Sequence, residues 1–140
     1  MILNCNFEEL QALRSGAELV LSGSGAPVET GSGMVGTSED VEELVAMLDG
    51  SISVHSLAEL ETIAGAVGLI SATLSRRLEE KVLELHPAHE EAVALYFDHA
   101  HSLVVLDRLA RMAAEMRALI ELMTGERPTA ESASSVRFPD

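Results

Sequence analysis

Histidines and carboxylates gather in one short stretch of the chain. Four of the five histidines lie between positions 86 and 101, beside several glutamates. Imidazole nitrogens and carboxylate oxygens are the groups that bind divalent metals such as Zn²⁺. His86, His89 and Glu90 are close enough in sequence to form a small site at the turn between two predicted helices. These three residues are the candidate metal ligands, and the competing interpretation is adventitious metal or none. No cofactor is predicted.

His99 is too far from that turn to share its ion, at about three helical turns along the chain. It falls instead in an otherwise apolar repeat. Counted back from the His86-Pro87 break, Ser71 of the preceding helix lies opposite positions near 101. Ser71, His99 and Ser102 are therefore predicted to face one another as a polar core layer, which can set the register of paired helices. A functional imidazole in the interior is the alternative.

Other motifs that carry chemistry are missing from the sequence. It has no nucleophile elbow, no HExxH pair and no P-loop. Gly31, Gly33 and Gly36 spell a dinucleotide-type glycine motif, but no buried strand precedes it and carboxylates flank it. Segment 22–37 is instead predicted to be a Gly/Ser-rich loop. Cys5 is the single cysteine, so it forms neither an intrachain disulfide nor a cysteine-rich zinc site. We expect a protein that is not an enzyme.

Two apolar stripes with heptad spacing predict the elements that position these residues. They are separated by Pro87, which suits the first turn of a helix. Together they indicate a mainly α fold built on a long antiparallel helical hairpin, about 56–85 and 87–124. The first stripe contains Leu57, Leu60, Ala64, Val67, Ser71, Leu74, Leu78, Lys81 and Leu85, and the second contains Ala92, Leu95, His99, Ser102, Leu106, Leu109, Ala113, Met116, Ile120 and Met123.

Shorter elements are expected before the hairpin. A helix is predicted over 7–15, and Gly16 could end it and leave 17–22 as a strand. A second short helix begins at Thr37 and Ser38, with an acidic first turn. Asp49 and Gly50 stop this helix. A minimal two-stranded β element could then pair residues 52–54 with residues 2–6.

The chain is long enough for one domain, predicted over 1–125, with a polar C-terminal tail at 126–140. Val136 and Phe138 could dock from that tail. Residues 62–75 form an uncharged run of fourteen residues, which is typical of a buried core helix and too short for a membrane span. No secretory signal is recognised, so a cytoplasmic protein is expected.

Further apolar residues widen the face of the later helix beyond what one partner helix covers: Val93, Tyr96, Ala100, Leu103 and Ala110. This width favours a homodimer that forms a four-helix bundle. Tyr96 and Phe97 are predicted to pack on small residues of the earlier helix. Arg76 and Arg77 are predicted to lie near Asp98 across the hairpin.

The net charge of −14 excludes nucleic acid and anionic membranes as partners. The first 75 residues hold eleven carboxylates against the single cation Arg14. We predict a non-catalytic acidic interaction protein, an adaptor, chaperone-like factor or regulator, whose protein partner is basic. Its partner-binding residues would be Glu39, Asp40, Glu42 and Glu43. Two alternatives remain: a nucleic-acid-mimicking inhibitor, or a metal- or small-ligand-binding bundle that uses His86, His89 and His99.

Overall fold

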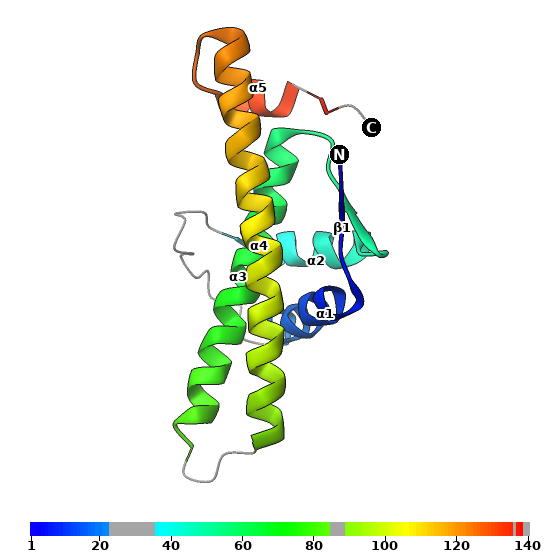
Figure 1. Cartoon of the computed structure of the whole chain (residues 1–140), viewed down its shortest axis with the longest axis vertical. Helices are drawn as coiled ribbons and strands as arrows, with labels where there is room; N and C mark the ends of the chain where they lie inside the picture. The colour runs from blue at the N-terminus through cyan, green and yellow to red at the C-terminus, as the bar shows by residue number, and fades with distance from the viewer. Residues whose placement is uncertain (23–35, 85–88, 136, 139–140) are drawn as a thin grey trace.

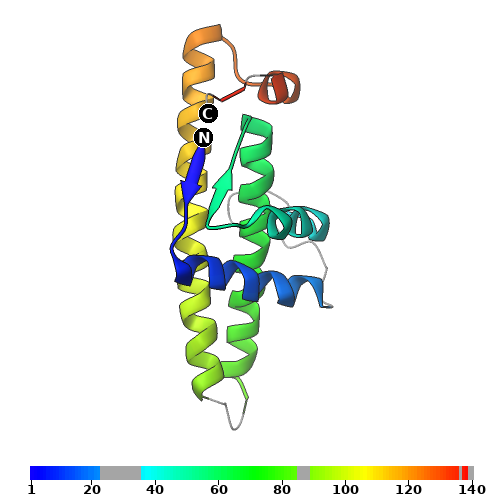
Figure 2. The same ribbon diagram turned by 90° about the vertical axis from the view of Figure 1, so that its right-hand side faces the viewer.

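Two long helices dominate the structure, a computed structural model that describes residues 1–22, 36–84, 89–135 and 137–138. Helices α3 (Leu57–Val82) and α4 (His89–Thr124) lie side by side and run in opposite directions (Figures 1 and 2). They confirm the predicted mainly α fold and its helical hairpin. The turn that joins them lies outside the described residues, as do Gly31 and Gly33 of the glycine motif.

Local signals in the sequence define the ends of this helix pair. Ser56 caps α3, because its Oγ accepts a hydrogen bond from the backbone N of Glu59 at 3.2 Å. Gly125 follows α4 with φ of 74°, a left-handed conformation that glycine adopts without steric cost and that ends the helix.

Helix α3 is the core of the molecule. Every residue from Ile63 to Ser71 is buried, which agrees with the uncharged run predicted to be core. Helices α1, α2, α4 and α5 all contact α3. By length and composition α3 could also cross a membrane, but 72% of its most apolar window is buried inside the fold, as in the core helix of a soluble protein.

Helix α4 turns its predicted heptad stripe toward α3. Leu95, Ser102, Leu109 and Ile120 of that stripe are all buried. Ala92, His99, Leu106 and Met116 are partly buried, and Met123, in the last turn of α4, is 77% exposed. The heptad spacing therefore identified the buried face of α4 along most of its length.

Helix α1 (Phe7–Leu21) is longer than predicted, and the alternative strand over 17–22 is wrong. Gly16 lies in the middle of this helix and does not end it. A Cβ at this position would lie 2.3 Å from Ile70 Cγ2 and 3.1 Å from Leu74 Cδ1. The glycine is therefore the point at which α1 comes close to α3.

The remaining N-terminal elements are a short helix and a ribbon. Helix α2 (Ser38–Met47) packs on α1 and α3 and lies beside α3, whereas α1 crosses both long helices (Figure 2). Strands β1 (Ile2–Asn4) and β2 (Ser51–Ser53) pair antiparallel, with Leu3 opposite Ile52. This is the predicted two-stranded element, and it is stable here because Leu3 and Ile52 are both buried in the core.

The C-terminal segment, predicted to be a polar tail, includes helix α5 (Ala130–Ser135), which contacts α3. Ala133 and Phe138 are buried, and Val136 lies outside the described residues. The backbone N of Phe138 donates to the carbonyl of His55 at 2.8 Å. The segment is therefore anchored beside the start of α3 (Figure 1).

Candidate functional site

The acidic residues of α2 divide into two roles. Glu39, Glu42 and Glu43 are exposed, whereas Val41 and Leu44 are buried against α3. Asp40 is used within the helix: its Oδ2 accepts from the backbone N of Thr37, and Thr37 Oγ1 accepts from the backbone N of Asp40, each at 3.2 Å. Three of the four predicted partner-binding carboxylates therefore face solvent from one short helix.

The predicted polar layer contains two buried hydroxyls. Ser71 on α3 and Ser102 on α4 are both buried, and Ser102 donates to the carbonyl of His99 at 2.7 Å. The hydrogen bond of Ser102 is therefore made within its own helix. His99 is only half-buried, and this burial lowers the pKa of its imidazole.

The candidate metal ligands lie at the end of the hairpin. His89 is the first residue of α4, Glu90 follows it, and both are exposed. His86 lies outside the described residues. His89 and His99 are separated by ten positions on α4, about 15 Å along the helix axis, so they cannot bind one ion. Within the described ranges, no three His, Cys, Asp or Glu side chains lie close enough to hold a metal.

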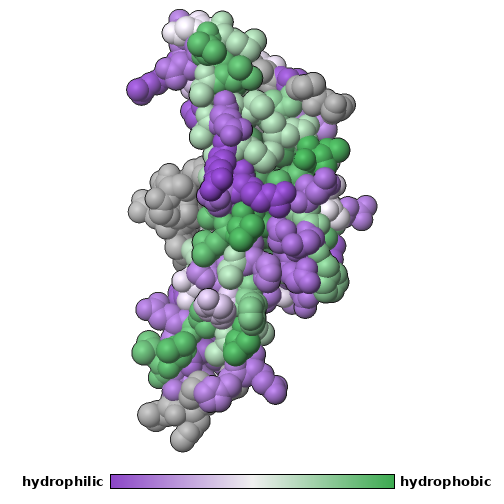
Figure 3. All heavy atoms as spheres, viewed as in Figure 1, coloured by the Kyte–Doolittle hydropathy of each residue, from purple (hydrophilic) through white to green (hydrophobic). Residues whose placement is uncertain are grey.

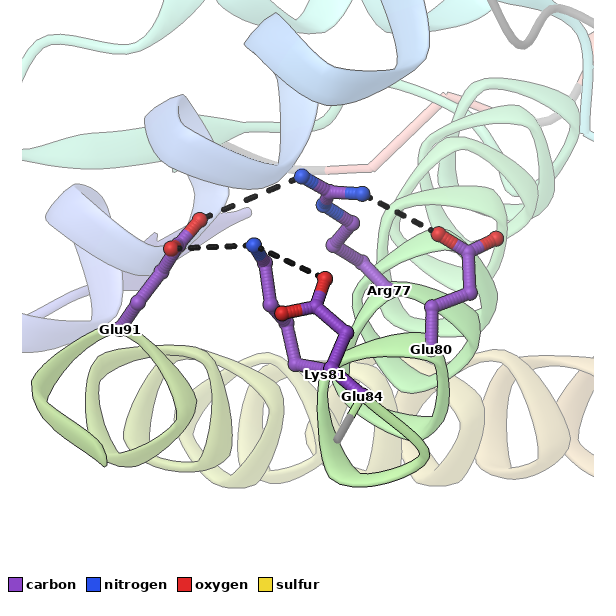
Figure 4. Close-up of polar contacts among 5 residues, drawn as sticks. All are labelled: Arg77, Glu80, Lys81, Glu84 and Glu91. Atoms are coloured by element: carbon purple, nitrogen blue, oxygen red, sulfur yellow. Dashed lines mark hydrogen bonds and ion pairs between the residues drawn. The ribbon is translucent and has the colours of Figure 1, made fainter. Parts of the chain in front are cut away.

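Ion pairs connect the two arms near this end. Lys81 Nζ lies 3.1 Å from Glu91 Oε2 and 3.3 Å from Glu84 Oε1 (Figure 4). Arg77 lies 3.2 Å from Glu80 and 4.0 Å from Glu91. Hydrogen bonds to Glu91 and Glu84 raise the pKa of the Lys81 amine. Glu91 thus links α4 to two cations of α3.

The predicted partner of Arg77 was wrong. Its cross-hairpin contact is Glu91, in the first turns of α4, and not Asp98. Asp98 is half-buried, and this burial raises the pKa of its carboxyl group. Spacing alone missed Glu91 because it locates the facing residues of two arms only to within a turn or two. The rotation of each helix then decides which side chains meet.

The side of α4 that faces away from α3 is exposed and apolar. Val93, Leu103 and Val104 are all more than two-fifths exposed, and Tyr96 and Phe97 are 58% and 54% exposed. The two rings contact each other edge to face, with centroids 5.7 Å apart. The predicted packing of these aromatic residues on α3 is therefore wrong. Apolar patches over α4 are visible above and below a polar band (Figure 3).

Two hollows lie elsewhere on the described part of the chain. One, of about 740 Å³, lies between α1 and α2 and is lined by Phe7, Arg14, Leu21 and Val45 among others. The other, of about 690 Å³, is lined mostly by alanines of α3, α4 and α5, together with Glu61 and Arg117, which form an ion pair. Both are wide open to solvent, and neither contains a histidine.

With this geometry in view, the chain was compared with known proteins. No protein-family model, no curated protein and no solved structure matches it. The function must therefore be argued from the surfaces of the molecule itself.

Proposed function

We propose that this protein is a non-catalytic, acidic interaction protein that forms a homodimer and binds a basic protein partner in the cytoplasm. The observation that carries the proposal is the exposed apolar face of α4. A helix that is apolar on both sides is normally buried on both sides. Here Tyr96 and Phe97 are more than half exposed, so the described residues of the chain do not give them full cover. A second protein surface would provide it.

The negative charge of the molecule favours a partner with a basic surface. The chain carries a net charge of −14, and Glu39, Glu42 and Glu43 are exposed on α2, a helix that packs on α1 and α3. Such a field speeds the encounter with a basic surface and opposes contact with anionic ones. The apolar face and the acidic face could therefore serve two different partners at the same time.

The first test is the mass of the purified chain in solution, measured by light scattering at 1–100 µM. We expect twice the 14.9 kDa of one chain at the upper end of this range. A mass of one chain at every concentration would contradict the dimer.

The second test addresses the basic partner. Pull-down from the native host is compared between the wild type and a variant with Glu39, Glu42 and Glu43 replaced by Lys. A matched control replaces the exposed Glu79, Glu126 and Glu131 by Lys, which changes the net charge equally. We expect the α2 variant to lose the captured protein and the control to retain it. Equal loss in both variants would indicate that only total charge matters.

The same pull-down separates the nucleic-acid-mimicking alternative, which the net charge of −14 also favours. A mimic would occupy the nucleic-acid groove of its target. Added DNA would then displace it, and capture would fall steeply as salt is raised. A partner that DNA does not displace favours the adaptor.

A further inference from the structure

One row of residues, spaced three or four positions apart, runs along the solvent side of α4. We call it the outer stripe. It extends for about 44 Å along the helix, and it lies on the side opposite the seam residues Leu95, Ser102 and Leu109. Its members are Val93, Phe97, Ala100, Val104, Asp107, Arg111, Ala114, Ala118 and Leu122.

Two charged residues lie at the middle of the outer stripe. Asp107 and Arg111 form an ion pair of 3.0 Å, with side chains 59% and 76% exposed. They lie on either side of position 109. The next members of the outer stripe, Val104 and Ala114, are apolar, and the exposed Glu115 lies beside Ala114. Such a pair makes the contact specific, because a partner surface must present the opposite charges in the opposite order.

A second copy of the outer stripe, running in the opposite direction, presents the charges in that order. In an antiparallel pairing about a two-fold axis at position 109, Asp107 faces Arg111 of the second copy, and Arg111 faces its Asp107. Val104 then meets Ala114, and Ala100 meets Ala118. A parallel pairing would bring Asp107 onto Asp107 and Arg111 onto Arg111, which is repulsive.

The ends of the outer stripe also match in size. At one end Tyr96 and Phe97 form an aromatic pair, and at the other Leu122 is 82% exposed. The same axis places Leu122 of the second copy opposite Tyr96. Tyr96 and Leu122 then meet at each end, where Phe97 falls opposite Glu121, and alanines at positions 100, 114 and 118 allow the helices to approach closely. From Ala100 to Ala118 the outer stripe is self-complementary, as a two-fold symmetric interface must be.

We propose that the outer stripe of α4 pairs antiparallel with the outer stripe of a second copy, about an axis at position 109. The two α4 helices then lie side by side between the two α3 helices, in a single layer of four helices. This inference rests on the proposed homodimer and assigns its surface and register. It leaves the acidic residues of α2 free for another partner.

Crosslinking tests the register directly. Two variants in a Cys5→Ser background, Val104→Cys and Ala114→Cys, are each treated with a short bis-maleimide, alone and mixed. In the proposed register, position 104 faces 114, whereas the two copies of position 104 are about 15 Å apart along the axis. We expect a crosslinked dimer in the mixture and little in either variant alone. If Val104→Cys alone crosslinked as strongly as the mixture, the antiparallel register would be overturned.

Charge reversal tests the proposed contacts between Asp107 of one copy and Arg111 of the other. Asp107→Arg and Arg111→Asp each bring like charges together across the axis, so each should dimerise at least tenfold more weakly than the wild type. An equimolar mixture of the two should recover the dimer, since each chain then meets opposite charges. Loss of the ion pair within α4 cannot explain that recovery, because mixing does not change it. Circular dichroism confirms that both variants are folded.

The outcomes separate this inference from the proposed function. A wild-type monomer at 100 µM overturns both. A wild-type dimer that both charge variants retain with full strength overturns the outer-stripe interface but leaves the homodimer standing. Recovery in the mixture together with the mixed crosslink supports both.

Discussion

Glu9 is a buried carboxylate that joins three elements of the fold. Its Oε2 contacts Arg108 Nη1 of α4 at 3.1 Å, and its Oε1 accepts from the backbone N of Asn6 at the start of α1. Arg108 Nη2 also donates to the carbonyl of Asn4 in β1 at 2.9 Å. Periodicity places position 9 near the start of a helix but does not reveal a partner that is 99 residues away in sequence.

Glu9→Gln tests the contribution of this pair. Removal of the charge leaves Arg108 without its counter-ion, but the guanidinium is partly exposed and water can solvate it. We therefore expect the free energy of unfolding to fall by about 1–2 kcal/mol. Urea denaturation measures this change. Glu8→Gln, at the exposed neighbouring position, is the control and should change stability by less than about 0.5 kcal/mol. Equal effects in the two variants would contradict the assigned role.

His99 makes stability depend on pH. Its burial lowers the pKa of the imidazole in the folded state, whereas in the unfolded chain the pKa is near the ordinary value of about 6.5. The unfolded chain therefore takes up a proton first as the pH falls. Stability decreases as the pH drops below about 6.5 and levels off below the lowered folded pKa.

A variant that cannot ionise at this position, His99→Gln, should lose less stability between pH 7 and pH 5 than the wild type. Denaturation curves at several pH values in this range measure the difference. Asp98 changes stability in the opposite direction as the pH falls, because burial raises the pKa of its carboxyl group. This effect develops at lower pH than that of His99. Parallel curves for the two proteins would show that His99 is not desolvated in solution.

At the scale of elements, the packing of α1 on α3 depends on a missing side chain. Gly16→Ala adds a Cβ that would lie 2.3 Å from Ile70 Cγ2. Ile70 is fully buried and β-branched, so its methyl group has little freedom to move. The clash outweighs the gain in helix propensity of about 1 kcal/mol, and we expect a net loss of about 1–2 kcal/mol.

The midpoint of urea unfolding, monitored by circular dichroism, measures this loss. Gln11→Ala, at an exposed position of the same helix, is the control and should have little effect. If Gly16→Ala were as stable as the wild type, or more so, α1 would not be held against α3 by this close contact.

At the scale of the whole molecule, the net charge of −14 is a cost to folding. Carboxylates repel one another more in the compact chain than in the unfolded one. Only a few ion pairs among the described residues offset this repulsion, and most of them are exposed. Sodium chloride should therefore raise the free energy of unfolding.

Most of this increase is expected by about 0.3 M salt, because the screening length has already fallen to about 10 Å at about 0.1 M. Thermal unfolding at rising chloride concentration measures it. Sulfate is avoided because it strengthens apolar burial directly. A decrease in stability with chloride would show that favourable ion pairs outweigh the repulsion.

What the sequence determined by itself was the helical hairpin, the two short helices before it and the buried face of each long helix, but not α5. Heptad spacing and the uncharged run at 62–75 are local patterns, and the core-facing sides of α3 and α4 follow from them. Capping residues are local too, so Thr37, Ser56 and Gly125 could be recognised in advance as helix ends.

Only the tertiary structure decided how these helices approach one another. Gly16 could equally be a helix stop or a contact point, and the Ile70 methyl group beside it settles the question. Tyr96 and Phe97 were apolar enough to be core, but α3 already presents its buried face to the seam of α4, so the two rings remain outside. Contacts between elements depend on helix rotation and crossing geometry, which a one-dimensional pattern does not contain.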